Sequence, residues 1–314
     1  MRYSLINTVA CMLFAGISVQ SSAAGTLGGL VEDFGNAYRN GKTTHLVDID
    51  NDSLLLQRDD GFYTSGLRYT QRYAIGDAAK STAFGWRMGQ ELYTASDVKL
   101  PPASIRPSDH PYAGWLYGGV FKETHHANGT YRKFGIDIGC LGPCAGGEWT
   151  QTNLHRLLNQ PLPQGWSRQV KNEAGVVLYA DAAPVRWTSG SSFDVTPNFH
   201  GRFGNIFTDI GAGLTVRAGR LNQLPDQSAL HAYLRVDGRA VGYNASMQGG
   251  YFSKNNVHTV APKRFVAEAE LGVAWSSAPY GFNLAIVRRS NEVRDLPNSI
   301  GTQNFARLQI SYTP

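Results

Sequence analysis

The sequence is poor in charge and in cysteine, and after its first residues it lacks a long apolar run. Only 17% of its 314 residues are Asp, Glu, Lys or Arg. No stretch after residue 24 approaches the roughly 18 continuous apolar residues that a membrane-spanning helix needs. A helical membrane protein is therefore excluded. Two classes stay open: a soluble secreted protein and a membrane β-barrel, whose apolar residues are diluted by alternation.

Residues 1–24 predict a secretory signal. They combine a charged start, a mostly apolar segment at 9–19 and a small-residue cleavage site, Ser-Ala-Ala, at 22–24. The Gly-rich, polar residues 25–42 are expected to form a flexible lead-in with at most one helical turn. No linker divides residues 43–314, so we expect them to form a single domain.

The three cysteines are few enough to interpret one by one. Cys11 leaves with the signal, which keeps Cys140 and Cys144. Because a secretory signal implies an oxidising envelope, we expect a disulfide between these two. A metal site is less favoured, because no second pair of Cys or His residues has zinc-like spacing.

The dominant pattern in the rest of the chain is alternation of apolar and polar residues. Alternate residues from Phe265 to Trp275 are apolar, and Glu268 and Glu270 lie on the opposite face. In the same way Tyr63 shares a face with Leu67, opposite Thr64. The pattern predicts twelve strands, at 44–54, 62–75, 83–94, 112–123, 131–141, 174–188, 191–201, 208–219, 229–243, 264–276, 280–291 and 303–313.

Strand periodicity alone fits both a soluble β-sandwich and a membrane barrel. The even number of strands is what single-chain bacterial barrels require. The 15 Tyr, 14 Phe, 6 Trp and 35 Gly also favour a barrel, which uses aromatic girdles and tight turns. We therefore predict an all-β fold, a transmembrane antiparallel barrel of about 12 strands. Its long polar gaps, 95–111 and 244–263, would be outer loops.

One short helix is predicted at 148–158, directly after a Gly/Pro-rich corner at 139–147. Gln151 and His155 are four residues apart, so their side chains share one face of it. A histidine displayed beside an amide, just past a tight corner, is the best candidate in this chain for a catalytic base. The alternatives are a solvated helix histidine and a glutamine that only caps or solvates the helix.

Five separate stretches, taken in order, resemble the outer-membrane lipid A 3′-O-deacylase family, and the resemblance covers nearly the whole chain after the signal. The stretches are 50–52 (Asp-Asn-Asp), 59–66 (Asp-Asp-Gly-Phe-Tyr-Thr-Ser-Gly), 90–97 (Gln-Glu-Leu-Tyr-Thr-Ala-Ser-Asp), 109–115 (Asp-His-Pro-Tyr-Ala-Gly-Trp) and 139–155.

The resemblance implies a twelve-stranded barrel in the bacterial outer membrane with an enzyme site in its upper interior. It implies hydrolysis of the ester that holds the 3′-linked acyloxyacyl chain on lipid A, with dependence on Ca²⁺. His155 would be the general base and Gln151 its neighbour. Asn51, Asp52 and Thr64 would form a polar cluster in which Asp52 is the metal ligand.

The chain also departs from the family pattern. Ser53 replaces a second acidic residue that can follow the Asn-Asp pair, which leaves the metal shell incomplete. Cys140 and Cys144 are additions to the corner, and His110 stands where Arg is usual.

The chemistry of these residue types supports the same assignment. A neutral imidazole can activate water near pH 7, and the developing oxyanion needs donors or a cation. Ca²⁺ prefers oxygen ligands, which Asp52 and nearby backbone could supply. The chain has no Gly-x-Ser-x-Gly elbow, which favours direct attack by water over an acyl-serine. Thr64 as a nucleophile is an alternative.

Blander interpretations stay open. Asn51 and Asp52 could be turn residues, and Thr64 a packing residue of a strand. Alternation puts Asn51 and Asp52 on opposite faces, so both reach one site only at a bulge or a strand end. For the whole protein, the alternatives are a catalytically inactive barrel (a small channel or a structural protein) and a soluble glycan-binding protein. We expect lipid A and the outer membrane as partners, a monomer, and no nucleic acid.

Overall fold

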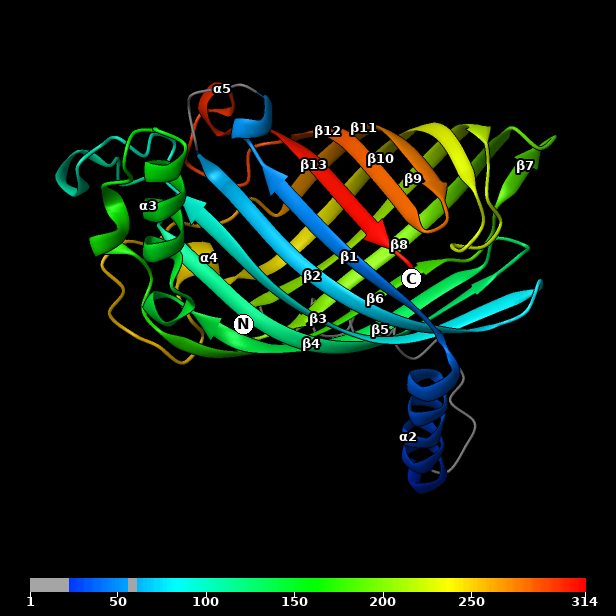
Figure 1. Ribbon diagram of the computed structural model, residues 1–314. Coiled ribbons are helices and arrows are strands. Elements are labelled where there is room, and N and C mark those ends of the chain that lie inside the picture. The colour runs from blue at the N-terminus through cyan, green and yellow to red at the C-terminus, as the bar shows by residue number, and fades with distance from the viewer. Residues whose placement is uncertain (1–22, 56–60) are drawn as a thin grey trace.

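The computed structural model describes residues 23–55 and 61–314 as a closed antiparallel barrel (Figure 1). The sheet order runs from β6 back through β1, then β13 down to β8, and pairing of β6 with β8 closes the ring. The strands are β1 (Lys42–Asn51), β2 (Phe62–Gly76), β3 (Lys80–Thr94), β4 (Ala113–His126), β5 (Tyr131–Leu141), β6 (Glu173–Ala183), β7 (Trp187–Ser189), β8 (Phe193–Gly204), β9 (Phe207–Arg220), β10 (Ala229–Asn244), β11 (Phe265–Ser277), β12 (Tyr280–Arg289) and β13 (Gln303–Tyr312).

Twelve strands form the barrel, as the alternation predicts, and β7 is a short extension that pairs with β8 alone. The helical segments are α2 (Ala23–Asn40), η1 (Ser53–Leu55), η2 (Pro102–Ser104), η3 (Pro143–Ala145), α3 (Gly147–Leu157), η4 (Gly165–Arg168), α4 (Ala245–Gln248) and α5 (Asn298–Gly301). No helix among the described residues is long and apolar enough to cross a membrane.

Two expectations for the N-terminal part meet different outcomes. The flexible lead-in at 25–42 is corrected, because the structure forms the helix α2 there. Apolar residues recur in this segment at helical spacing, a signal that the many glycines obscure. The predicted signal peptide lies mostly outside the described residues, which begin at residue 23.

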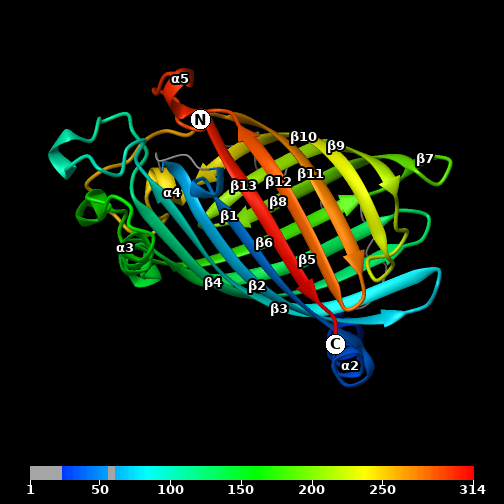
Figure 2. The same ribbon diagram turned by 45° about the horizontal axis from the view of Figure 1, so that its top comes forward.

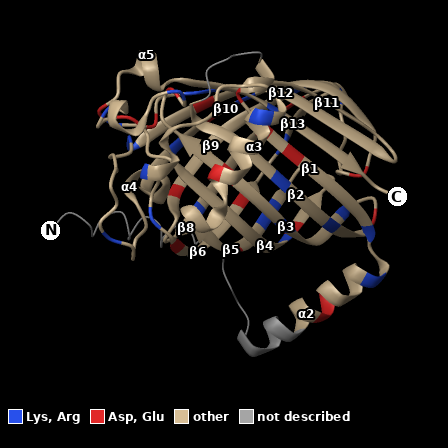
Figure 3. Cartoon of the chain, turned by 60° about the vertical axis from the view of Figure 1, so that its left-hand side comes forward, with Lys and Arg blue, Asp and Glu red and all other residues tan. Residues whose placement is uncertain are grey.

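The wall turns its apolar face outward and its charged face inward. Leu271 is 62% exposed on the outside, whereas its neighbour Glu270 is 5% exposed and contacts Tyr233 and Arg307 inside. Charged residues recur along the strands (Figure 3). Ion pairs that line the interior include Arg68–Asp48, Arg72–Glu123, Arg87–Asp137, Arg202–Asp209, Arg217–Asp194 and Arg307–Glu270. The pairing of β6 with β8 closes the wall, and hydrocarbon would not tolerate an open sheet edge there.

One residue departs from strict alternation because β2 contains a bulge. The register shifts between Tyr63 and Ser65, so Thr64 is the extra residue. Tyr63 therefore points inward, where its hydroxyl donates to Asp50 Oδ2 at 3.1 Å. The prediction that Tyr63 shares the outward face of Leu67 was wrong for this reason.

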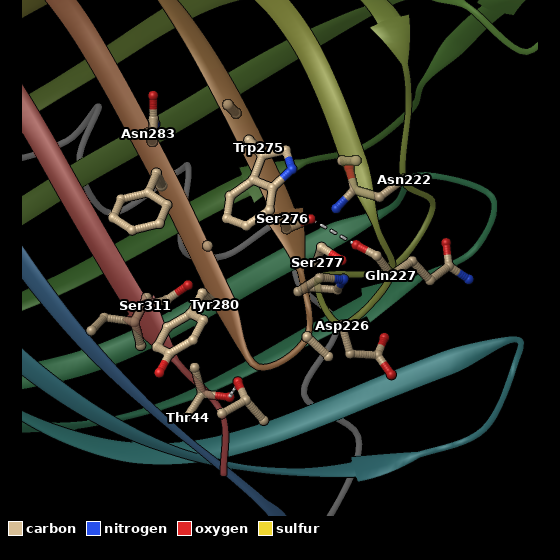
Figure 4. Close-up of a pocket in the computed structure, with 18 of the residues that line it drawn as sticks. Thr44, Asn222, Asp226, Gln227, Trp275, Ser276, Ser277, Tyr280, Asn283 and Ser311 are labelled. Carbon is tan, nitrogen blue, oxygen red and sulfur yellow. Dashed lines mark hydrogen bonds between the residues drawn. The ribbon is translucent and has the colours of Figure 1, made fainter.

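The two ends of the barrel differ in the length of their connections. Turns of two to nine residues, such as 77–79 and 278–279, join strands at the end that carries the C-terminus (Figure 2). The long loops predicted at 95–111 and 244–263 are observed at 95–112 and 245–264, and they lie at the opposite end together with α3, α4 and α5. Near the terminus end the interior holds a cavity of about 270 Å³, lined by Thr44, Gln227 and Tyr280 among others (Figure 4).

Candidate active site

The corner that precedes α3 fixes where this helix begins. Gly142 and Gly146 have φ values of 93° and 68°, which favour glycine, and the predicted disulfide between Cys140 and Cys144 is confirmed, with a Cα–Cα distance of 6.0 Å. Gly147 lies against the ring of Trp166 so closely that a Cβ would be 2.6 Å from it. The helix is thereby held against β3 and β4.

His155 lies on the buried face of α3 and is 3% exposed. Its Nδ1 lies 2.5 Å from the carbonyl oxygen of Pro161. Because a carbonyl oxygen only accepts hydrogen bonds, Nδ1 carries the proton and Nε2 is the basic nitrogen of the neutral ring. The solvated-histidine interpretation does not fit a buried ring with a fixed tautomer.

Gln151 lies beside His155 on the same buried face and is 1% exposed. Its Oε1 accepts from Trp166 Nε1–H at 2.9 Å. Because an indole nitrogen only donates, this contact fixes which end of the amide is which. Nε2 is then left buried, with no hydrogen-bond partner among the described residues. Gln151 therefore presents amide donors on the face that carries the imidazole. The imidazole itself is oriented by its hydrogen bond to the Pro161 carbonyl.

The remaining candidates lie where β1 and β2 end. Asn51 is the last residue of β1, and its Oδ1 accepts from Ser53 N–H at 2.8 Å, which is the role of a turn residue. Asp52 follows, 5% exposed, and its Oδ2 accepts from Gly61 N–H at 3.1 Å. Because β1 ends at Asn51, strict alternation no longer separates Asn51 and Asp52, and both can lie in the same region.

Thr64 is the bulged residue of β2 and is 2% exposed. Its hydroxyl is 2.7 Å from that of Thr94 at the end of β3. This contact joins the second and third strands at the loop-bearing end. The five predicted residues therefore lie at one end of the barrel in two groups, the helix pair and the strand-end cluster.

The strand-end cluster offers only part of a calcium shell. Asp52 is a buried carboxylate, which suits a hard cation. Within the described ranges, no three His, Cys, Asp or Glu residues gather closely enough to hold a metal ion. Asp59 and Asp60, part of the family motif, lie outside those ranges.

A second buried histidine lies next to the strand-end cluster. The ring of His110 stacks on Tyr93 at 5.6 Å, and its Nδ1 is 2.6 Å from the carbonyl oxygen of Pro111. Burial lowers the pKa of His110, which favours a neutral ring. Asp109 accepts from the backbone and hydroxyl of Ser96, so this loop is fixed against the end of β3.

Sequence reasoning missed the residues that hold the candidates in place: Trp166, Pro161 and Thr94. Only Thr94 lies within a family motif. Pro161 lies in the connection after α3 and Trp166 in the single turn η4, and neither belongs to a periodic sequence pattern that could have identified it.

A closed twelve-stranded barrel with a charged interior and an apolar outer wall defines the class of bacterial outer-membrane β-barrels. A model of the family described as "Outer membrane protein LpxR" matches residues 9–313, so the chain belongs to this family and is an outer-membrane protein. No curated protein matches the chain.

A solved structure has the same fold. LpxR from Salmonella typhimurium superposes with a TM-score of 0.71 at 21% sequence identity, covering 86% of this chain and 100% of that one. At this identity the likeness shows the fold alone. The β domain of the Bordetella autotransporter BrkA and the translocator domain of NalP from Neisseria meningitidis have TM-scores of 0.46 and 0.40, at 10% identity, covering 87% and 92% of this chain and 98% and 96% of theirs. Scores this low carry no argument.

Proposed function

We propose that this protein is a lipid A 3′-O-deacylase, which hydrolyses the ester of the 3′-linked acyloxyacyl chain. The observation that carries the proposal is His155: it is buried on one face of α3, and its Nδ1–H is held by the Pro161 carbonyl, so that Nε2 is basic. Membership of the LpxR family supports lipid A as the substrate.

In the proposed reaction, His155 Nε2 takes a proton from a water molecule whose oxygen attacks the ester carbonyl carbon. The carbon–oxygen bond to the sugar then breaks. The proton on His155 passes to the departing 3′ oxygen, which leaves a sugar hydroxyl and a free acyloxyacyl acid. Gln151 Nε2 donates to the carbonyl oxygen as negative charge develops on it. Asn51 and Thr64 would contact the substrate or the oxyanion from the strand ends.

Asp52 would hold Ca²⁺ together with oxygen ligands that the described residues do not complete. Bound there, the cation would supply positive charge for the ester carbonyl. If this is right, a chelator should abolish turnover by the wild type, and Asp52→Ala should need more calcium for any activity it keeps. Full activity in chelator would remove the metal from the scheme and leave the role of His155 intact.

The main test is mass spectrometry of lipid A from cells that express either the wild type or His155→Ala. Wild-type cells should lose the mass of the 3′-linked acyloxyacyl group, and cells with the variant should keep it. Both proteins must be present as folded barrels, which heat-modifiable migration on a gel would establish. The inactive barrel would be favoured instead if lipid A stayed intact in two assays. One uses cells that contain the folded wild type, and the other uses the same protein mixed with lipid A in detergent.

A further inference from the structure

The helix α2 has one apolar stripe and one polar side. Leu30, Phe34 and Ala37 recur at spacings of four and three, and Val31 and Tyr38 widen the stripe. The opposite side carries polar residues: Glu32, Asn36, Arg39 and Asn40. This spacing is typical of an amphipathic helix with a single buried face.

The C-terminal half of the stripe packs on the outside of the barrel wall. Ala37 is fully buried there. The ring of Phe34 lies 6.4 Å from that of Tyr73 on β2 and 6.1 Å from that of Phe84 on β3, both edge-on. Tyr38 packs on Tyr73 at 5.1 Å.

An ion pair secures the same contact. Asp33 on α2 accepts from Lys122 Nζ on β4 at 3.4 Å, and the same ammonium lies 4.8 Å from the ring centre of Phe84. Tyr73, Phe84 and Lys122 belong to the outward face, because they alternate in register with exposed Leu67, Met88 and Val120. Figures 1 and 3 show α2 outside the barrel, at the end where β1 begins.

The N-terminal half of the stripe continues beyond this contact without protein to cover it among the described residues. Leu30 is 41% exposed and Val31 is 71% exposed, one turn before Phe34. A short apolar stripe on a helix with a polar opposite side is the pattern of helices that lie in a membrane interface. The surface that α2 joins is the outer wall of an outer-membrane barrel, which already contacts lipid.

We propose that α2 lies in the periplasmic leaflet of the outer membrane, with Leu30 and Val31 among the phospholipid acyl chains and Glu32 and Asn36 toward water. The leaflet follows from the turns: short connections mark the periplasmic end of bacterial barrels, and α2 is at that end. We assign lipid as the partner of the exposed stripe, because the stripe is continuous with the outer wall of the barrel, which contacts lipid. The proposal does not depend on catalysis.

The test places a spin label at either of two positions of the full mature chain, Val31→Cys on the stripe and Asn36→Cys on the polar side. The native cysteines are paired with each other, so each variant offers one thiol. Each labelled protein is reconstituted in vesicles of phosphatidylethanolamine and phosphatidylglycerol. Collision rates with oxygen and with a water-soluble nickel chelate then give the depth of the label.

The label at Val31 should lie about 5–10 Å below the headgroup boundary, the depth usual for such helices, whereas the label at Asn36 should lie in water. Equal access of nickel to both positions would overturn the proposal. Two other results would also overturn it: a label at Val31 that neither oxygen nor nickel reaches, and a label whose spectrum is broadened by the label of a second protein molecule. Either result would mean that protein covers the stripe. Both substitutions are on exposed positions, and gel migration checks that the barrel is folded.

Discussion

Among the described residues the two longest helices, α2 and α3, lie at opposite ends of the barrel and bury opposite kinds of face. α2 buries Ala37 within an apolar stripe and leaves its charged residues outside. α3 does the reverse, because Gln151 and His155 are buried while Trp149 and Leu157 are 73% and 82% exposed. The helix α3 therefore exposes apolar side chains and buries polar ones, whereas α2 follows the rule of ordinary surface helices.

The difference indicates that α3, rather than α2, carries the candidate catalytic residues. Burying a polar side chain costs free energy unless it is hydrogen-bonded. On α3 this cost is limited by two specific partners, the Pro161 carbonyl for His155 and the Trp166 indole for Gln151. On α2 no such partner is needed, because aromatic contacts with Tyr73 and Phe84 bury the apolar stripe.

The largest expected effect comes from the buried face of α3. His155→Ala should lower the deacylation rate by about 10²–10⁴-fold, because general-base assistance is worth that much. The matched control is Asn153→Ala on the same helix, whose side chain donates to the Trp149 carbonyl on the exposed side. Release of acyl chain from lipid A in detergent measures both. Equal rates for the two variants would show that the buried face of α3 has no catalytic role.

The second prediction compares the apolar outward face of the barrel wall with its polar inward face. Leu271→Arg should destabilise the folded barrel by about 2–4 kcal/mol if this position lies near the bilayer midplane. Glu270→Gln should cost much less, because Tyr233 can still donate to the amide and Arg307 keeps Asp50. Denaturant unfolding in lipid vesicles measures both. Equal losses would mean that the outward surface of β11 does not contact lipid.

The sequence predicts the wall well because each strand repeats one simple rule over many residues. The faces of Glu270 and Leu271 follow directly from alternation, and the bulge at Thr64 is where the rule fails. A bulge adds one residue to a pattern of period two. Nothing in the composition around Tyr63 marks where that residue is added.

The candidate site is less predictable from sequence, for a physical reason. The shared face of Gln151 and His155 follows from helical spacing, and the disulfide from Cys140 and Cys144 being alone in an oxidising compartment. The residues that hold them in place do not follow, because Trp166 and Pro161 reach α3 from the connection 158–172, whose sequence has no periodic pattern. Contacts of this kind depend on how loops fold back, which no local pattern encodes.

The third prediction tests how closely α3 must be held. A Cβ at Gly147 would lie 2.6 Å from the Trp166 ring and 3.0 Å from Leu92, so Gly147→Ala must move the helix or the indole. Overpacking of this sort typically costs about 1–3 kcal/mol, and the displaced helix should also lose activity. Gly118→Ala is the control, because its nearest neighbour is an oxygen at 3.8 Å. Unfolding and deacylation assays should separate the two variants, and an unaffected Gly147→Ala would mean that the corner tolerates movement.

The smallest predicted effect concerns the orientation of the Gln151 amide. Trp166→Phe removes the N–H that donates to Oε1, and it also removes the Cη2 and Cζ3 atoms that lie against Gly147. One hydrogen bond is worth about 1 kcal/mol, so the deacylation rate should fall roughly fivefold. The loss should appear in kcat rather than KM, because a Gln151 amide that can flip no longer directs its Nε2 donor toward the developing oxyanion. In a Gln151→Ala background the same substitution should have no further effect. A fivefold loss that persists in that background would show that Trp166 acts through packing, and no loss in either background would remove the amide orientation from the mechanism.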